Sequence, residues 1–411
     1  MNKYLISWIF LYSIFPLFAQ EQTLKLSLKQ TEDLFLKQNL SLIAEQLNVD
    51  IADAAIVQAK LWDNPELTIG DVNLWKKGEE KQFSIELSQL IRTANKRQKL
   101  VSMEKVSKEM AIRELEETLR NLKVELRKSI YELKYLQMYR KTLDKPHQSL
   151  EQLINAYRKQ TAQGNTSKNE LLRLQSSLLE LENEINEVQT GLNEQQKALK
   201  SLLNIDPLIS IEIAQELPEA VSPDKLTLAN LLEIAAEERS DIKYRQLEVK
   251  YHEKSLIYEK ALRVPDITLS AGYDRLGGVW NDFIGLGISM ELPVFNRNKG
   301  NIQASRLNIE KSKQLSQQQL KTIHYEVVAS FDNYNQAYWF YEKISNNELL
   351  SELDNMLDVY SKNMLNKNIN MLEYLDFMEA YKNNKQTVLL AVKNMQISFA
   401  ELQYSVGQEI K

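Results

Sequence analysis

Residues 265–292, PDITLSAGYDRLGGVWNDFIGLGISMEL, decide the fold expected for this chain. Two runs of about nine residues alternate apolar with small or polar side chains, and Gly277, Gly278 and Trp280 lie in the loop between them. Alternation of period two places the apolar side chains on one face of a strand and the small ones on the other. The stretch predicts a β-hairpin whose strands either cross a bilayer at a tilt or pack on a soluble core.

The hairpin belongs to a unit that occurs twice. The sequence PELTI at 65–69 returns 200 positions later as PDITL at 265–269, and KLSL at 25–28 returns as KLTL at 225–228. After the hairpins the spacing becomes 203, because Asn95-Lys96 matches Asn298-Lys299 and Glu170 matches Glu373. Such repetition indicates tandem copies of one structural unit. We expect a first repeat over 20–207, a linker over 208–223 and a second repeat over 224–411.

Each repeat predicts the same order of elements. An opening helix is expected at about 27–60 and 227–262, a β-hairpin at about 66–90 and 266–293, and a long helix at about 93–160 and 298–365. Tight tips at about 161–167 and 364–370 lead into shorter returning helices. About 65 helical residues reach about 100 Å, longer than any compact domain needs. Pro146 is expected to kink the first long helix.

The returning helix of the first repeat carries a heptad pattern. Its apolar residues are spaced alternately by three and four, interrupted only at Gln195: Leu171, Leu174, Leu178, Leu181, Ile185, Val188, Leu192, Leu199 and Leu202. This spacing predicts knobs-into-holes packing against a neighbouring helix. The fold class expected from these patterns is mainly α-helical with a small β part.

The composition narrows the possible functions. A net charge of −5 provides no broad basic surface for nucleic acid. Because there is no cysteine, disulfides, thiolate metal sites, cysteine nucleophiles and an N-terminal lipid anchor are excluded. His147, His252 and His324 are scattered and predict no metal cluster, and no cofactor-binding or catalytic motif stands out. We therefore expect no cofactor, no metal and no enzymatic activity.

The first 19 residues predict a signal peptide. Lys3 precedes an almost wholly apolar run over 4–17, and Ala19 offers a small residue before Gln20. The run is short for a spanning helix, which needs about 20 residues, so export and cleavage are favoured over an N-terminal membrane anchor. The position of the cut stays open, because Leu17 is large for a site of this kind.

The order of elements and four local motifs carry a resemblance to a known family. The motifs are the two proline segments at 65–69 and 265–269, Thr93-Ala94-Asn95-Lys96-Arg97, and the tip segment Glu373-Tyr374-Leu375-Asp376. Over essentially the whole mature chain, this order resembles that of the TolC-type outer membrane efflux proteins. The segment at 93–97 resembles a Gly-Lys-Arg element of the cation-efflux branch, with Asn95 in place of Gly, and the tip segment resembles the family's Asp-x-Leu-Asp element.

The resemblance implies an exit duct. Three chains would share one outer-membrane β-barrel, to which each gives four strands, and a long α-helical barrel would continue it into the periplasm. The homotrimer would contact outer-membrane lipid, a periplasmic adaptor of the membrane fusion class and an inner-membrane pump that delivers small solutes. The predicted strands support a trimer independently of the resemblance. A four-stranded sheet has two unpaired edges, which lipid does not tolerate, so other copies must close it.

Two acidic residues are candidates for the pore or gate. Glu373 and Asp376 are three residues apart and share one face of a helix. The resemblance matches them to acidic positions at the periplasmic entrance, where three copies would form a ring that favours cations. The alternative is an ordinary solvated helix face. In the first repeat, Glu170 and Arg173 occupy the matching face, so the two tips are expected to differ.

Two further groups of residues are candidates for contacts. Gly164, Asn165, Lys367 and Asn368 lie at the predicted tips and are candidates for adaptor contact, although turn chemistry explains them equally well. Trp75, Tyr273, Trp280 and Phe283 lie in or beside the hairpins and could form an aromatic belt at the lipid interface. For Phe283, which falls on the small-residue side of its strand, core packing is the alternative.

Other functions share part of this pattern. A periplasmic or surface coiled-coil adaptor without a pore shares the heptads and the export signal, but it needs no hairpins of membrane-spanning length. A cytoplasmic coiled-coil scaffold with a misread N-terminus is a second alternative, and an enzyme a third. For an efflux duct the cargo stays open between metal or other cations, drugs, dyes and polypeptides. The Lys96-Arg97 element favours cations.

Overall fold

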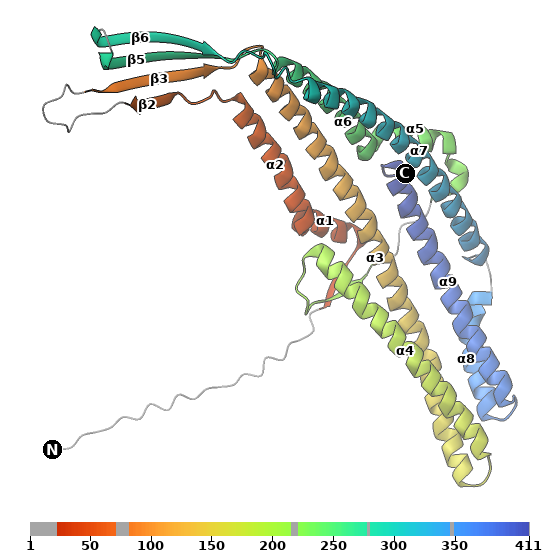
Figure 1. The fold of residues 1–411 in the computed structure, drawn as a ribbon. Coiled ribbons are helices and arrows are strands. Elements are labelled where there is room, and N and C mark those ends of the chain that lie inside the picture. Colours follow the sequence, from red (N-terminus) through yellow and green to blue (C-terminus); the bar gives the residue numbers. More distant parts are fainter. Residues whose placement is uncertain (1–22, 71–81, 215–220, 278–279, 346–348, 411) are drawn as a thin grey trace, which may run out of the picture.

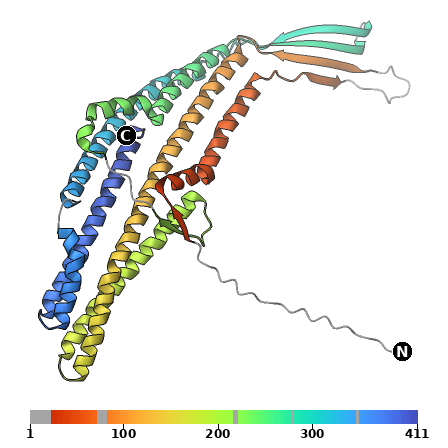
Figure 2. The same cartoon turned by 180° about the vertical axis from the view of Figure 1, so that it is seen from behind.

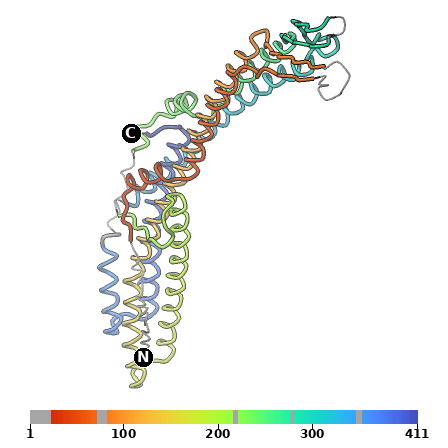
Figure 3. The backbone as a smooth tube through the Cα atoms, turned by 90° about the vertical axis from the view of Figure 1, so that its left-hand side faces the viewer, coloured from red at the N-terminus to blue at the C-terminus, as the bar shows by residue number. Residues whose placement is uncertain are grey.

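A computed structural model describes residues 23–70, 82–214, 221–277, 280–345 and 349–410. The chain is elongated, with a β-sheet at one end and two helical hairpins at the other (Figure 1). Seen edge-on in Figure 3, the helical layer curves between these two ends. The shape follows from long helices with few breakers, because α3 alone has 67 residues and spans about 100 Å at 1.5 Å per residue.

The first half of the chain contains four helices and four strands in its described part. They are β1 Thr23–Leu26, α1 Leu28–Gln38, α2 Leu40–Lys60, β2 Glu66–Gly70, β3 Ser84–Ile91, α3 Lys96–Ala162, α4 Lys168–Leu203 and β4 Ser210–Ile213. Helix α3 continues through Pro146, where a kink was expected, as a single helix. The heptad prediction for α4 is confirmed, since Leu174, Leu181 and Leu199 are fully or almost fully buried and α4 packs along α3.

The second half repeats this order. It contains the short 3-10 helix η1 Pro223–Lys225, then α5 Leu228–Glu238, α6 Ser240–Ala261, β5 Ile267–Gly277, β6 Trp280–Met290, α7 Lys299–Ser345, α8 Leu349–Leu365 and α9 Met371–Val406. The sequence predicts one long helix over 298–365. The structure describes α7 and α8 within that range, and residues 346–348 between them lie outside the described part.

The strands of the two hairpins form one antiparallel sheet in the order β2-β3-β5-β6. The repeats meet where β3 pairs with β5, with Ile85 opposite Tyr273 and Leu87 opposite Ala271. The register places one set of mostly apolar side chains on a common face: Leu67, Ile69, Ile85, Leu87, Ile267, Leu269, Ala271, Tyr273, Ile284, Leu286, Ile288 and Met290. The opposite face carries mainly small or polar side chains, among them Glu86, Ser270 and Ser289.

Four helices continue the sheet as a layer in the same order. Helix α2 packs beside α3, α3 beside α6, and α6 beside α7 (Figure 1). Seen from behind in Figure 2, the α3–α4 and α8–α9 hairpins run side by side toward the opposite end. Helix α9 holds the two hairpins together, because it packs against α3 of the first as well as against α7 and α8. The layer therefore has two open edges, α2 with β2 on one side and α7 with β6 on the other.

Each predicted opening helix is broken in two, and the prediction of one helix over 27–60 or 227–262 was wrong in this respect. Asn39 and Arg239, at corresponding positions, both take extended backbone conformations and end one helix while starting the next. The Asn39 side chain accepts a hydrogen bond from the backbone N–H of Leu42, which caps α2, and donates one to the carbonyl of Leu202. A capping side chain thus replaces the hydrogen bonds that the break removes.

The sequence analysis missed a second, two-stranded sheet. Strand β1 pairs in parallel with β4, in the segment expected to be a linker. On the other edge of β4, glutamine side chains pair with the backbone of Ile211. Gln196 donates a hydrogen bond to its carbonyl and accepts one from its N–H, and Gln137 also donates to the carbonyl. The alternation Ile209, Ile211, Ile213 was the available signal, but strands of four residues are too short for periodicity to identify.

Candidate functional site

The tips of the two helical hairpins lie together at one end of the chain (Figure 1). The predicted tip residues Gly164, Asn165, Lys367 and Asn368 are all exposed there. The Lys367 ammonium donates a hydrogen bond of 3.2 Å to the backbone carbonyl of Asn165 and so joins the two tips. We call these two turns, 163–165 and 366–368, the tip pair.

The two turns share one backbone geometry. The N–H of Asn165 donates to the carbonyl of Gln160 at 2.9 Å, and the N–H of Asn368 donates to that of Asn363 at 2.8 Å. The residue before each donor takes a left-handed conformation, at φ 77° for Gly164 and 60° for Lys367. In the second repeat a lysine thus takes the left-handed position that a glycine takes in the first. The left-handed conformation costs a lysine about 1–2 kcal/mol of conformational free energy. The hydrogen bond from the Lys367 ammonium to the first tip offsets part of this cost.

Glu373 and Asp376 are exposed at the start of α9, next to the tip pair. Asn370 caps this helix by accepting a hydrogen bond of 2.9 Å from the N–H of Glu373. A carboxylate in the first helical turn is favoured by the helix dipole, which accounts for Glu373 without any pore. Asp376 lies outside the first turn and has no such local explanation. The matching pair in the first repeat, Glu170 and Arg173, is also exposed.

Charged contacts join the two hairpins behind the tips. Lys382 of α9 pairs with Glu184 of α4 at 2.6 Å, and Glu184 also accepts a hydrogen bond from Tyr139 of α3. Burial, then the bond to this carboxylate, raises the pKa of Tyr139, so its hydroxyl stays protonated. The three side chains connect three helices from both repeats.

A second set of contacts holds α8. Asp354 accepts hydrogen bonds from Tyr381 and Lys385 of α9, both at 2.7 Å, and Lys145 of α3 donates to its backbone carbonyl at 2.7 Å. Burial opposes the charged carboxylate, but the bonds from Lys385 and Tyr381 outweigh it and lower the pKa of Asp354. The second hairpin is thus tied to the first by charged groups in addition to apolar packing.

The aromatic candidates lie at the opposite end, on the sheet. Trp280 is exposed and its ring lies 6.1 Å from that of Phe283. The register places Phe283, opposite Asp274, on the polar face. The Tyr273 side chain belongs to the apolar face and donates a hydrogen bond of 2.5 Å to Asp282. Trp75 lies outside the described residues.

The segment 93–97 proves to be a structural junction between strand and helix. Ala94 and Asn95 have positive φ angles of 52° and 55°, which turn the chain from β3 into α3. The side chain of Lys96 is buried and pairs with Asp266 of the second repeat at 2.7 Å. Burial opposes the Asp266 carboxylate, but the bonds from Lys96 and Thr93 prevail and lower its pKa. The lysine that favoured cations in the sequence is therefore occupied in joining the repeats.

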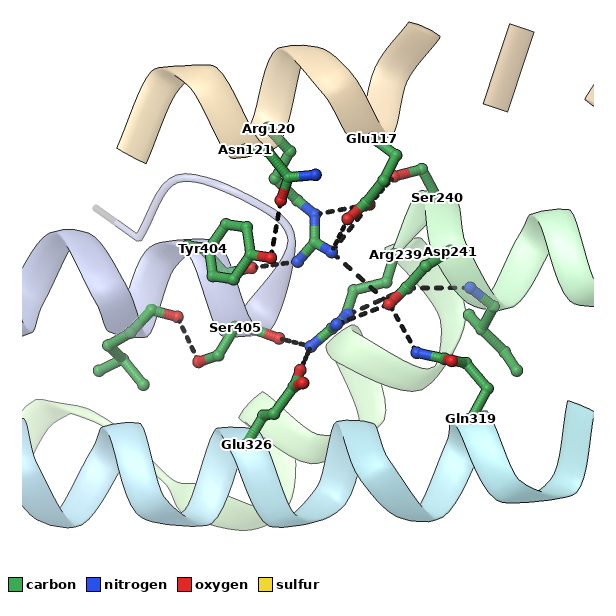
Figure 4. Close-up of polar contacts among 12 residues, drawn as sticks. Glu117, Arg120, Asn121, Arg239, Ser240, Asp241, Gln319, Glu326, Tyr404 and Ser405 are labelled. Atoms are coloured by element: carbon green, nitrogen blue, oxygen red, sulfur yellow. Dashed lines mark hydrogen bonds and ion pairs between the residues drawn. The ribbon is translucent and has the colours of Figure 1, made fainter. Parts of the chain in front are cut away.

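A buried charged cluster that the sequence analysis missed lies where α3, α6, α7 and α9 meet (Figure 4). Arg239, only 2 % exposed, binds Asp241 at 2.6 Å, Glu326 at 2.7 Å and the carbonyl of Ser405 at 2.9 Å. Arg120 lies 3.6 Å from Asp241 and binds Glu117 at 2.7 Å. We call these residues the Arg239 cluster.

A glycine makes room for the Arg239 cluster. Gly407, which ends α9 at φ 85°, lies against Arg239, and a Cβ there would come within 2.7 Å of the Arg239 Cγ. In the first repeat Asn204 takes the corresponding left-handed position. The cluster joins the end of the chain to three other helices, and its parts are too far apart in sequence for a motif to indicate them.

Neither a cluster of metal-binding side chains nor a membrane-spanning helix occurs in the described part of the chain. It contains no group of three or more histidine, aspartate or glutamate side chains arranged to hold a metal ion. Its helices include none that is both long and apolar enough to cross a membrane.

Comparison with known proteins shows which of them this chain resembles. Residues 33–204 match the family model described as outer membrane efflux protein. Among solved structures, the CmeC outer membrane channel of Campylobacter jejuni is 14 % identical with a TM-score of 0.77, and the match covers 92 % of this chain and 85 % of that one. No curated protein matches the chain.

Two further solved structures share the fold. The outer membrane protein VceC of Vibrio cholerae is 16 % identical with a TM-score of 0.71, over 92 % of this chain and 96 % of that one. CusC, described for conformational changes that accompany folding and transmembrane channel formation, is 18 % identical with a TM-score of 0.71, over 94 % of both chains. The predicted mainly helical fold with a small sheet part is confirmed by this similarity.

Proposed function

We propose that this chain, which belongs to the outer membrane efflux protein family, is an exit duct in the outer membrane of a Gram-negative cell. Solutes would pass through it passively, with the energy supplied elsewhere. The family is one of channels, and the described residues provide the architecture of a conduit. The sheet end lies in the membrane in this proposal, and the tip pair lies in the periplasm.

The observation that carries the proposal is the uncovered apolar face of the four-stranded sheet. Leu286 is 87 % exposed, and Ile284 and Ile288 are exposed beside it. No described helix packs on this face, and the opposite face carries small and polar residues. Apolar side chains on one face and polar ones on the other suit strands with lipid outside and water inside. A sheet of a soluble protein would bury this face.

Closure into a barrel requires other copies. The sheet has two unpaired edges, β2 and β6, and the helical layer has the matching edges α2 and α7. Lipid does not tolerate unpaired strand edges, and a second copy offers β2 to β6. We infer a homotrimer in which each chain gives four strands to a twelve-stranded barrel, continued by a helical barrel. The resemblance to the TolC-type proteins implies the same arrangement.

The tip pair is the proposed contact for a periplasmic adaptor and an inner-membrane pump. Its exposed residues Gly164, Asn165, Lys367 and Asn368 lie at the end of the chain farthest from the sheet. The bonds of Lys382 to Glu184 and of Lys145 to the backbone carbonyl of Asp354 would hold the second hairpin against the first while the duct is closed. The exposed acidic pair Glu373 and Asp376 favours cations, including metal ions, as cargo.

Conductance measures the proposed function directly. Purified protein, reconstituted into planar bilayers, is expected to give discrete single-channel currents and to require detergent for extraction from outer-membrane fractions. A coiled-coil adaptor without a pore would instead extract without detergent and leave the bilayer silent, and that result would overturn the proposal.

The acidic pair makes a separate prediction. In the Glu373→Gln/Asp376→Asn variant we expect the cation over anion permeability ratio to fall at least about twofold, because the ring loses its charge. Reversal potentials in a salt gradient give this ratio. Glu170→Gln, at the matching position of the first repeat, is the control and should change it less. An unchanged ratio in the double variant would leave Glu373 and Asp376 as a solvated helix face.

A further inference from the structure

We infer that neighbouring chains join by setting α2 of one against α7 of the next, in the register that already joins α6 to α3 within the chain. We call the α3–α6 contact the inner seam and the α7–α2 contact between chains the outer seam. The outer seam is apolar at two places where the inner seam is polar. This inference rests on the proposed homotrimer and deepens it.

The inner seam is built from polar contacts along its whole length. Near the sheet, Lys96 pairs with Asp266 at 2.7 Å. In the middle, Lys250 of α6 pairs with Glu109 of α3 at 3.1 Å. Beside this pair, burial and then the charge of Glu104 of α3 raise the pKa of Tyr251 of α6. At the far end, the hydroxyl of Ser240 donates to Glu117 at 2.8 Å. The two helices run antiparallel, so these contacts fix their register.

The internal repeat supplies the corresponding positions. Helix α2 matches α6 at a spacing of 200, because Asn39 and Arg239 both start their helices from an extended conformation. Helix α7 matches α3 at a spacing of 203, because Asn95 and Asn298 both precede their helices with φ 55°. A contact between α3 and α6 therefore maps onto one between α7 of one chain and α2 of the next.

The mapped positions are chemically complementary. The Ser240–Glu117 contact maps onto Leu40, 62 % exposed, and Leu320, 37 % exposed. The neighbouring residues Tyr251 and Glu104 map onto Ile51, 64 % exposed, and Leu307, 59 % exposed. All four are apolar and lie open on the isolated chain.

One mapped pair is charged. The Lys96–Asp266 pair maps onto Lys299 and Glu66, which are both exposed and which form no ion pair within the described residues. Opposite charges thus occupy the end of the outer seam beside the sheet, as they do in the inner seam. The Lys250–Glu109 pair maps onto Asp50 and Ser312, the second of which is buried within its own chain. The mapping thus yields two apolar pairs, one pair of opposite charges and one charged–polar pair, with no clash of like charges.

The difference between the seams has a physical reason. The inner seam joins two parts of one chain, so covalent connection already limits their separation and polar contacts suffice to set the register. Chains that meet in the membrane or periplasm lose translational and rotational freedom, and burial of apolar area must offset that loss. The exposed stripe along α2, which also includes Ile43 and Leu47, provides such area. Within one chain, α2 and α7 cannot meet, because α3 and α6 lie between them.

Engineered disulfides test the register, and the natural absence of cysteine leaves no background. After mild oxidation of the trimer, Leu40→Cys/Leu320→Cys and Ile51→Cys/Leu307→Cys are expected to run as covalent dimers and trimers on a non-reducing gel. The shifted control Leu40→Cys/Leu307→Cys is expected to stay monomeric. Its α7 position lies 13 residues from Leu320, about 20 Å along the helix, whereas a disulfide spans about 6 Å between Cα atoms.

Charge exchange provides a second readout that does not depend on oxidation. Lys299→Glu or Glu66→Lys alone is expected to lower the trimer fraction in native mass spectrometry, and the two together are expected to restore it. If the shifted cysteine pair crosslinks while the matched pairs do not, the register is overturned, although a conducting trimer would keep the proposed function intact. A parent protein that is monomeric and non-conducting would overturn both.

Discussion

Leu286→Arg is expected to destabilise the membrane-inserted protein by about 2–4 kcal/mol, the cost of an arginine near the bilayer midplane. Leu286 is the most exposed of the apolar residues on β6, at 87 %, so the isolated chain offers no packing reason for any loss. Only lipid against this face makes a charge there costly. The free energy can be measured by denaturant unfolding from lipid vesicles, followed by the fluorescence of the nearby Trp280.

Ser289→Arg is the matched control on the same strand. Ser289 lies on the opposite face of the sheet, where the barrel interior would hold water, so its free energy of unfolding is expected to change by less than about 1 kcal/mol. Equal small effects of the two substitutions would indicate that both faces meet water. That outcome would remove the membrane assignment of the sheet.

Arg239→Met is expected to lower the free energy of unfolding by about 3–5 kcal/mol, because it removes one partner of a buried ion pair and leaves the other uncompensated. Arg239 is almost fully buried, and its partner Asp241 is largely buried. Burial opposes the charge of Asp241, but the bonds from Arg239 and the charge of Arg120 prevail and lower its pKa. Chemical denaturation of the detergent-solubilised protein, followed by circular dichroism, gives the difference.

The pH dependence of this effect has a defined sign. A carboxyl with a lowered folded-state pKa adds stability above its unfolded pKa of about 3.9 and loses it as the pH falls through the folded value. The deficit of Arg239→Met should therefore be full at neutral pH and shrink in acid. Arg245→Met is the control, because its pair with Glu248 is partly exposed and is worth less than about 1 kcal/mol. Equal losses of unfolding free energy in the two variants would show that the Arg239 cluster stabilises the fold no more than an exposed ion pair does.

The periodic features of the fold could be predicted from the sequence. Alternation in 267–277 and 280–290 predicts strands and identifies their apolar face, and the heptads in 171–202 predict that α4 packs on α3. Both patterns depend only on local spacing, which the fold preserves. The match of residues 33–204 to the outer membrane efflux protein model agrees with the family that the order of elements and the tip motifs indicate.

The contacts that join distant segments could not be predicted in this way. Arg239 meets Glu326 and Ser405 across 87 and 166 residues, and Lys96 meets Asp266 across 170. In the sequence each is one charged residue in a polar stretch, and nothing local marks it as buried. The helix breaks at Asn39 and Arg239 were missed for a related reason, since neither residue is a proline or a glycine. Both side chains bind carbonyls elsewhere in the fold, Asn39 that of Leu202 and Arg239 that of Ser405.

The tip candidates show the limit of local turn chemistry. Gly164 takes a left-handed conformation, which a glycine adopts readily. Lys367 adopts the same conformation at a cost and is held to Asn165 by a hydrogen bond between the repeats. The acidic pair Glu373 and Asp376 stays a prediction, because its proposed ring exists only between chains.

Accessibility along β6 tests the central claim, that the apolar face of the sheet meets lipid and the polar face meets water. Single cysteines at 283, 284, 286, 288 and 289 in the reconstituted protein would be treated with a water-soluble thiol reagent and, separately, with a lipid-soluble quencher after fluorescent labelling. We predict that 284, 286 and 288 are quenched from the lipid and slow to react in water, while 283 and 289 show the reverse. Uniform reaction of all five positions with the water-soluble reagent would contradict the account.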